Sequence, residues 1–283
     1  PDGTTLVFRG SFHATTVNFE LYSVGVTGTP AAARISKGAQ PAGGDVDAGN
    51  WQFTAVAPTR VIYTGQFDTA DKDILSSDLV SDASALVLNV PKAGSGVAAI
   101  TFTQCGGRVI FRGPFETDAL FYLYSASPTS AGVAANLLSQ AQGTATGDVD
   151  DTMAGVAGWF CGGPAANPTH IVYKGPVLVA GQNEIFSNTV NPGATRNVLS
   201  PSLAASVIGQ WELSPNRLRV VWIGTFTDAT NRLYSATLDT VGAQISAAGT
   251  GGGSGAVLDF RISGTSAQVA YRGPIDNTVD NVF

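Results

Sequence analysis

The amino-acid sequence predicts an all-β chain, a six-bladed β-propeller whose blades are four-stranded antiparallel sheets. Three observations predict it: one pentapeptide recurs six times, short apolar runs flank each copy, and turn-forming residues separate the runs. Helical periodicity is nearly absent, and its one candidate, residues 204–207, is too short for a helix. A repeat of roughly 50 residues is typical of radial β architectures.

The pentapeptide consists of two aliphatic residues, an aromatic residue, a residue that is usually basic, and glycine. Branched aliphatic and aromatic residues favour strands, so each copy is expected to form the second strand of a blade. The sixth copy has Ala270 in its second position. The copies end at Gly10, Gly65, Gly113, Gly175, Gly224 and Gly273.

Further strand-like segments surround each copy. An alternating segment precedes it, as at residues 51–54, 100–103 and 258–261. A Leu-Tyr-Ser motif follows it at 21–23, 123–125 and 233–235, with a variant at 185–187, and a short apolar piece such as 136–138 or 197–199 closes the unit. One such sheet cannot bury both of its faces, so neighbouring blades are expected to pack face to face.

The six repeats form one predicted β-propeller domain over residues 1–283. The chain opens inside the turn that precedes a second strand, and it ends where the sixth repeat forms its third strand. The first and last blades are therefore expected to be incomplete, with flanking sequence outside this chain. The approximate repeats are 1–40, 50–91, 98–140, 155–200, 207–248 and 256–283.

The repeats resemble the TolB-like family of six-bladed propellers, whose WD40-like repeats begin Ser-Pro-Asp-Gly. The segments that bear the resemblance are residues 1–10, 20–24 and 43–46, and residues 214–216 repeat the same turn. The resemblance covers nearly the whole chain. It implies the propeller fold and leaves the function open, because such propellers occur in many envelope and secreted proteins.

The composition limits the classes of partner and the cellular location expected for the protein. Charged residues make up 13% of the chain, the net charge is −6, and lysine and arginine form no cluster, so a nucleic-acid partner is not expected. No apolar run approaches the roughly 20 residues of a membrane-spanning helix. The chain opens at Pro1 rather than Met, as after removal of an export signal. We expect a secreted, periplasmic or cell-surface protein.

Acidic residues gather in turns that the predicted topology places on one face of the propeller. The bland interpretation is that aspartate suits turns, because it bonds to nearby backbone amides. The alternative is an acidic face that attracts a cation, with Arg9, Arg112, Lys174 and Arg272 as neutralising partners inside the chain. The second-to-third-strand turns contain Asp68, Asp71, Asp73, Glu116, Asp118, Asp228, Asp276 and Asp280.

Calcium is the one cofactor considered, because it needs hard oxygen ligands presented by loops. Two Gly-Asp-Val-Asp runs in the connections between blades make the candidate sites, although neither matches a complete calcium loop. Their residues are Asp45, Asp47, Asp148, Asp150 and Asp151. Apart from calcium, no cofactor is expected.

Catalytic residues are not identified. His13 and His170 lie in different repeats without supporting spacing and are expected in surface loops. Cys105 and Cys161 lie near the ends of first strands in neighbouring repeats. An exported protein permits a disulfide between them, and two separate buried thiols are the alternative.

Aromatic residues are expected to serve packing. Trp51, Trp159, Trp211 and Trp222 fall in predicted strands and are assigned to the blade core. Phe12, Phe67, Phe115 and Phe226 each follow a repeat glycine by two residues, which suggests a plug of the turn rather than a ligand platform.

These features predict a non-catalytic extracellular or cell-envelope propeller that serves as a protein-interaction scaffold or a structural assembly subunit. Its expected partner is another protein or a further copy of itself. Two alternatives stay open: a secreted hydrolase or lyase with a carboxylate-bound metal, and a carbohydrate-binding propeller. An enzyme would show a convergent polar cluster at the channel mouth, and a sugar binder would show exposed aromatics at equivalent positions.

Overall fold

The computed structural model describes most of the chain, in segments. Every structural statement below concerns these residues. They are 3–12, 18–27, 31–37, 45–55, 57–67, 72–89, 100–117, 120–131, 135–139, 149, 158–178, 182–191, 193, 196–201, 207–226, 230–246, 256–274 and 280–282.

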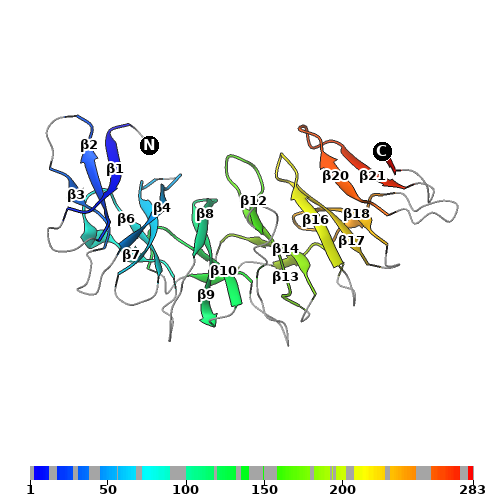
Figure 1. The fold of residues 1–283 in the computed structure, drawn as a ribbon, viewed down its shortest axis with the longest axis horizontal. Helices are drawn as coiled ribbons and strands as arrows, with labels where there is room; N and C mark the ends of the chain where they lie inside the picture. Colours follow the sequence, from blue (N-terminus) through cyan, green and yellow to red (C-terminus); the bar gives the residue numbers. More distant parts are fainter. Residues whose placement is uncertain are drawn as a thin grey trace. The chain divides into compact units, whose positions relative to one another are not determined.

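The described residues form six antiparallel sheets in chain order, and within each sheet every strand pairs with the next one along the chain (Figure 1). Four sheets have four strands, and the first and last have three. The predicted all-β class, with four-stranded antiparallel sheets consistent with propeller blades, is confirmed. A 3-10 turn, η1, spans Asp82–Ser84.

We number the sheets as blades 1 to 6. Blade 1 is β1 (Thr5–Gly10), β2 (Glu20–Gly25) and β3 (Ala33–Arg34), and blade 2 is β4 (Asp45–Phe53), β5 (Val61–Gln66), β6 (Asp73–Ser77) and β7 (Leu86–Val87). Blade 3 is β8 (Thr101–Cys105), β9 (Arg108–Thr117), β10 (Leu120–Ala126) and β11 (Asn136–Leu137). Blade 4 is β12 (Trp159–Gly162), β13 (His170–Gly175), β14 (Glu184–Thr189) and β15 (Arg196–Val198). Blade 5 is β16 (Val207–Leu213), β17 (Arg219–Thr225), β18 (Arg232–Thr237) and β19 (Ala243–Gln244), and blade 6 is β20 (Asp259–Ile262), β21 (Val269–Pro274) and β22 (Asp280–Val282).

The chain divides into two compact units, Pro1–Leu137 and Leu138–Phe283. The first unit contains blades 1 to 3, and the second contains blades 4 to 6. A single domain over the whole chain stays a prediction. Among the described residues no helix is both long and apolar enough to cross a bilayer.

Blades pack face to face within each unit. The side chains of each second strand alternate between its two faces, so one strand contributes to the packing on both neighbouring blades. In β9, Val109 and Phe111 point to one face and Ile110 and Arg112 to the other, because successive strand residues alternate. We call the face that packs on the preceding blade the leading face, and the opposite face the trailing face. The aromatic residue of the pentapeptide belongs to the leading face.

The same residue positions recur at the interfaces between blades 1 and 2, blades 2 and 3, and blades 4 and 5. A trailing face contributes three aliphatic residues, which cover the aromatic leading face of the next blade. On blade 1 they are Val7, Leu21 and Ile35, against Tyr63 and Phe67 of blade 2. The corresponding trailing residues are Ile62, Ile74 and Leu88 on blade 2 and Val172, Ile185 and Leu199 on blade 4.

In blades 2, 3 and 5 an arginine satisfies a buried serine of the third strand. Arg60, Arg108 and Arg219 lie at or just before the start of second strands. The Nε atom of each donates to the hydroxyl of the serine that follows the aromatic position of the third strand, over 2.7, 2.6 and 3.1 Å. A buried polar group without a partner costs about 1–3 kcal/mol, so this bond gives the serine of the Leu-Tyr-Ser motif its role.

A serine or asparagine at the end of the fourth apolar piece secures the third strand. Ser36, Ser200 and Ser246 accept the backbone N–H of Leu21, Ile185 and Leu233 at 3.0–3.1 Å. Asn89 accepts the N–H of Ile74 at 2.9 Å in the same way. The short fourth strands are therefore held by side chains as well as by ladder bonds.

Alkaline pH is expected to weaken the first unit through Tyr63. Burial raises the pKa of this fully buried phenol to about 12, whereas Ser77 and the backbone N–H of Lys37 bond to its oxygen. An unfolded tyrosine ionises near pH 10. Because the unfolded state then loses its proton first, the free energy of unfolding falls as the pH rises from about 10 to about 12.

Urea unfolding at about pH 9 and about pH 11.5 measures this loss, with Tyr63→Phe as the comparison. The variant should show a smaller fall in the urea midpoint between the two pH values. An identical fall in both proteins would contradict the assignment to Tyr63.

Candidate functional site

In four of the six repeats, the ring of a phenylalanine two residues further on covers the repeat glycine. A Cβ added at Gly65, Gly113 or Gly224 would lie 2.3–2.6 Å from a ring carbon of Phe67, Phe115 or Phe226, so only glycine fits beneath the ring. These three rings are nearly fully buried, which confirms the predicted plug of the turn.

Phe12 of blade 1 occupies the same position but is 66% exposed. Its ring makes T-shaped contacts with Phe8 and Tyr22, at centroid distances of 5.8 and 4.8 Å. The same T-shaped contact joins Phe115 to Tyr124 at 5.4 Å in blade 3, where all rings are buried. Blade 1 therefore has the same aromatic cluster as blade 3. The two blades differ in that the cluster of blade 3 is buried, whereas Phe12 in blade 1 is exposed.

The rest of the leading face of blade 1 is open as well. Leu6 is 53% exposed, whereas Val109 and Val220, at the same position in blades 3 and 5, are fully buried. Phe8 is half-buried, and its counterpart Phe111 is fully buried. The face therefore presents packing residues of interior type to solvent.

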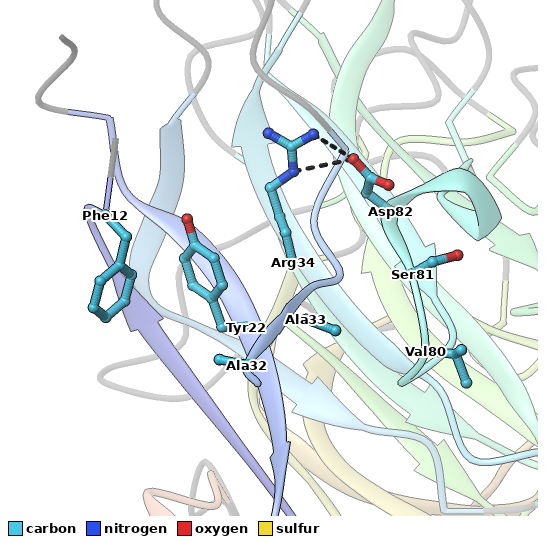
Figure 2. A pocket seen from close by; sticks show the side chains of 8 residues that line it. All are labelled: Phe12, Tyr22, Ala32, Ala33, Arg34, Val80, Ser81 and Asp82. Atoms are coloured by element: carbon cyan, nitrogen blue, oxygen red, sulfur yellow. Dashed lines mark hydrogen bonds and ion pairs between the residues drawn. The ribbon is translucent and has the colours of Figure 1, made fainter. Parts of the chain in front are cut away.

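A groove adjoins this face, with a cavity volume of about 470 Å³. Its walls come from β2 and β3 of blade 1 and from the turn at residues 80–82 of blade 2 (Figure 2). Val80 on the rim is 74% exposed. The lining residues are Phe12, Tyr22, Ala32, Ala33, Arg34, Val80, Ser81 and Asp82.

Charged groups hold the two sides of the groove together. Figure 2 shows the guanidinium of Arg34 reaching from β3 to the carboxylate of Asp82, and its Nε donates over 3.0 Å. Arg34 Nη1 also donates to Glu20 over 3.2 Å, and Tyr22 donates its hydroxyl to the same carboxylate over 2.7 Å. Burial and the Glu20 carboxylate raise the pKa of Tyr22 to about 12.

This network fixes the groove by ionic bonds within the chain. Burial alone would lower the pKa of Arg34, but its bonds to Asp82 and Glu20 outweigh burial, and the pKa is raised overall. The guanidinium therefore stays charged at any physiological pH. The arrangement supplies a rigid polar wall beside exposed aromatic and aliphatic side chains, which suits the binding of a surface rather than proton transfer.

The sequence did not single out Glu20, Arg34 or Asp82. Glu20 and Tyr22 are two residues apart in β2, so both side chains lie on the leading face. This spacing could have been recognised in the sequence. Arg34 and Asp82 come from different blades, and their pairing depends on how those blades pack.

Three of the predicted acidic residues have described side chains, and all three lie in strands rather than in loops. Asp45 and Asp47 belong to β4, and Asp73 belongs to β6. Asp45 bonds to Arg9 over 3.3 Å and accepts the N–H of Phe19 over 3.0 Å, while Asp47 bonds to Lys72 over 2.8 Å. Asp73 accepts the amide of Asn89 over 2.9 Å. The predicted neutralisation of acidic residues by Arg9 is confirmed for Asp45.

Glu116 lies in strand β9 and Asp280 lies in strand β22. The prediction that both residues lie in turns is therefore wrong. The strands extend further than expected, because the ladder bonds continue past the apolar residues. The remaining acidic candidates, Asp68, Asp71, Asp118, Asp148, Asp150, Asp151, Asp228 and Asp276, lie outside the described residues.

The calcium sites stay a prediction. In the described segments no three histidine, cysteine or acidic side chains gather as a metal site would require. The two described candidates, Asp45 and Asp47, already have a protein cation as partner.

Cys105 is buried and Cys161 is half-buried. They belong to different units, so their pairing also stays a prediction.

His170 begins strand β13, which corrects its assignment to a surface loop. Its Nε2 lies 3.1 Å from Asp239 Oδ1, and its Nδ1 lies 2.9 Å from the hydroxyl of Thr169. These contacts link blade 4 to the turn after β18 in blade 5. His13 lies outside the described residues.

The tryptophans fulfil the expectation of core positions. Trp159, Trp211 and Trp222 are buried, and Trp51 is half-buried.

Comparison with known proteins gives structural matches. No family model matches the sequence. No curated protein matches it either. TolB from Acinetobacter baumannii aligns with a TM-score of 0.36 and 15% identity, covering 84% of this chain and 50% of that protein. A protein described as TolB from Agrobacterium tumefaciens aligns with a TM-score of 0.37 and 14% identity, covering 80% of this chain and 73% of that one.

Structural similarity to TolB, which the repeats predicted, is thus found at low sequence identity. The chain spans half the length of the Acinetobacter protein.

Proposed function

We propose that this chain is a non-catalytic protein-interaction module, and that the groove and open leading face of blade 1 form its contact surface. The observation behind the proposal is the exposure of Phe12, 66% against 5% for Phe115 at the equivalent position. Large apolar side chains gathered on a surface mark sites of protein association.

The composition of the surface supports a protein partner. Phe12 and Val80 supply exposed apolar area, and the buried ring of Tyr22 supports Phe12 from within the chain. The polar groups of the groove, Arg34, Glu20 and Asp82, bind one another at its rim. A sugar-binding platform would need exposed aromatics at the equivalent positions, which are buried in blades 2, 3 and 5.

We further propose that the module works outside the cytoplasm, as a secreted, periplasmic or cell-surface protein. The low charged fraction of 13% supports this location, together with the two cysteines that an oxidising compartment would allow to pair.

Site-specific photo-cross-linking tests the contact surface. A benzophenone side chain placed at position 12 should cross-link to protein in the native host, whereas the same group at position 115 should react only within the chain. Both positions hold the same residue type in equivalent turns, so position 115 is a matched control. Equal labelling at the two positions, or no protein adduct at position 12, would contradict the proposal.

A further inference from the structure

The turn between β16 and β17 of blade 5 holds an arginine in a backbone conformation that favours glycine. Arg217 has a φ of 60°, in the left-handed region, where few residues other than glycine lie. Gly3 of blade 1 occupies the equivalent position before its own pentapeptide and has a φ of 72°. Because glycine adopts this conformation without strain, arginine at this position costs folding stability, and such strain is typical of functional sites.

Hydrogen bonds hold this turn in one conformation. The backbone N–H of Arg217 donates to the carbonyl of Ser214 over 2.7 Å, and Asn216 Oδ1 accepts the N–H of Leu218 over 3.1 Å. The hydroxyl of Ser214 accepts the N–H of Arg219 over 3.0 Å. The backbone that carries the Arg217 side chain is therefore fixed before any ligand binds, which lowers the entropic cost of binding.

The neighbouring blades fix the same turn from both sides, within the second compact unit. The carbonyl of Arg217 accepts the N–H of Gly163 in blade 4 over 2.8 Å. Ser266 Oγ of blade 6 accepts the N–H of Asn216 over 2.9 Å. Ser266 occupies the position of Arg217 in its own repeat and also has a positive φ, of 61°. Its hydroxyl therefore has a structural role that accounts for a serine at this position.

The guanidinium of Arg217 is exposed and has no partner in the described part of the chain. Every other arginine has a hydrogen bond, a ring contact or an electrostatic partner. Even Arg261, whose side chain is 80% exposed, donates to the carbonyl of Phe260 over 3.1 Å. Within the described residues, Arg217 is thus the one guanidinium left to bind another molecule.

The surroundings of Arg217 favour a single carboxylate as its ligand. The linked turns of blades 4 and 6, residues 163–169 and 263–268, contain no charged residue. Arg219, the other charge in the turn, donates from Nε to the hydroxyl of Ser235 over 3.1 Å. A polyanion such as a nucleic acid or a sulfated polysaccharide needs several cations gathered together, whereas one guanidinium matches one carboxylate through two parallel hydrogen bonds.

We propose that Arg217 binds a side-chain carboxylate of a protein partner, on the face formed by the first-to-second-strand turns of blades 4 to 6. Leu218 beside it is 45% exposed and supplies apolar area, so the partner is an acidic segment with an aliphatic residue next to its carboxylate. The site goes beyond the contact surface proposed for blade 1 and shares no residue with it. Either surface can therefore fail its test without the other.

Selection of short random peptides displayed on phage, with the purified full chain as bait and counter-selection against Arg217→Gly, tests the proposal. The remaining peptides should contain aspartate or glutamate, and its exchange for asparagine or glutamine should weaken binding by about tenfold or more. Arg217→Gly should bind them equally weakly but unfold at the same or a higher urea concentration, because its backbone strain is relieved. Arg261→Gln changes another exposed arginine and should bind them like wild type.

The controls make each contrary result decisive. No peptide left after counter-selection would overturn the proposal, and so would selected peptides without a carboxylate. A clearly lower urea midpoint in Arg217→Gly would show that Arg217 serves the fold and would also overturn it. Retention of wild type but not of Arg217→Gly on immobilised heparin, with no peptide selected, would indicate a polyanion instead. Phe12→Ser should leave peptide binding unchanged, which separates this site from the surface of blade 1.

Discussion

Phe111→Ala is expected to lower the free energy of unfolding by about 3–5 kcal/mol, the usual cost of emptying a buried phenylalanine site. Phe111 is fully buried, stacks on Tyr124 at 5.4 Å and meets Phe115 edge-on at 5.6 Å. Because whole domains are stable by only about 5–15 kcal/mol, this one change removes a large share of the total.

Phe8→Ala is the matched control for this experiment. Phe8 occupies the same position in blade 1, within the same compact unit, and stacks on Tyr22 in the same way at 5.8 Å. Its ring is half-buried, so the variant should lose less than about half as much stability. Urea unfolding followed by circular dichroism measures both. Equal losses would show that the leading face of blade 1 is as well covered as that of blade 3.

Gly113→Ala is expected to cost about 1–3 kcal/mol, because the added methyl group overpacks a filled site. Its Cβ would lie 2.5 Å from Cε2 and 2.9 Å from Cζ of Phe115, whose ring is 5% exposed and cannot move aside. The strand itself would accept alanine, since Gly113 does not have a positive φ.

Gly10→Ala makes the same change beside an exposed ring. The added methyl group would meet Phe12 at 2.4 Å, but Phe12 can swing into solvent, so we expect a cost under about 1 kcal/mol. A further variant isolates the cause in blade 3. Combining Gly113→Ala with Phe115→Leu should cost less than the sum of the single changes, because the smaller side chain relieves the clash. Simple additivity in that cycle would contradict the ring–glycine contact.

Much of the fold could be predicted from the sequence because the packing residues repeat. The pentapeptides became second strands, and Trp159, Trp211 and Trp222 entered the core, since their positions in the repeat imply a buried face. The bounds of the strands were less predictable. Asp45 and Asp47 lie in β4 because ladder bonds extend across polar residues, which hydrophobic alternation does not reveal.

The candidate site was much less predictable. Phe12 has the same sequence context as Phe115, and only the presence of a covering blade distinguishes the two. The bond from Arg34 to Asp82 joins two blades across 48 residues of sequence, so no local pattern reports it. Sequence repeats identify equivalent positions, whereas the structure shows which of them are left uncovered.

Solvent exposure of the plug residue in each blade tests the central claim most directly. Fluorophenylalanine introduced singly at positions 12, 115 and 226 can be observed by fluorine NMR while a soluble paramagnetic agent is added to dilute protein. The agent should broaden the signal from position 12 strongly and leave those from positions 115 and 226 nearly unchanged. Equal protection at all three positions would mean that the leading face of blade 1 is covered in the isolated chain, and it would contradict the assignment of this face as a free contact surface.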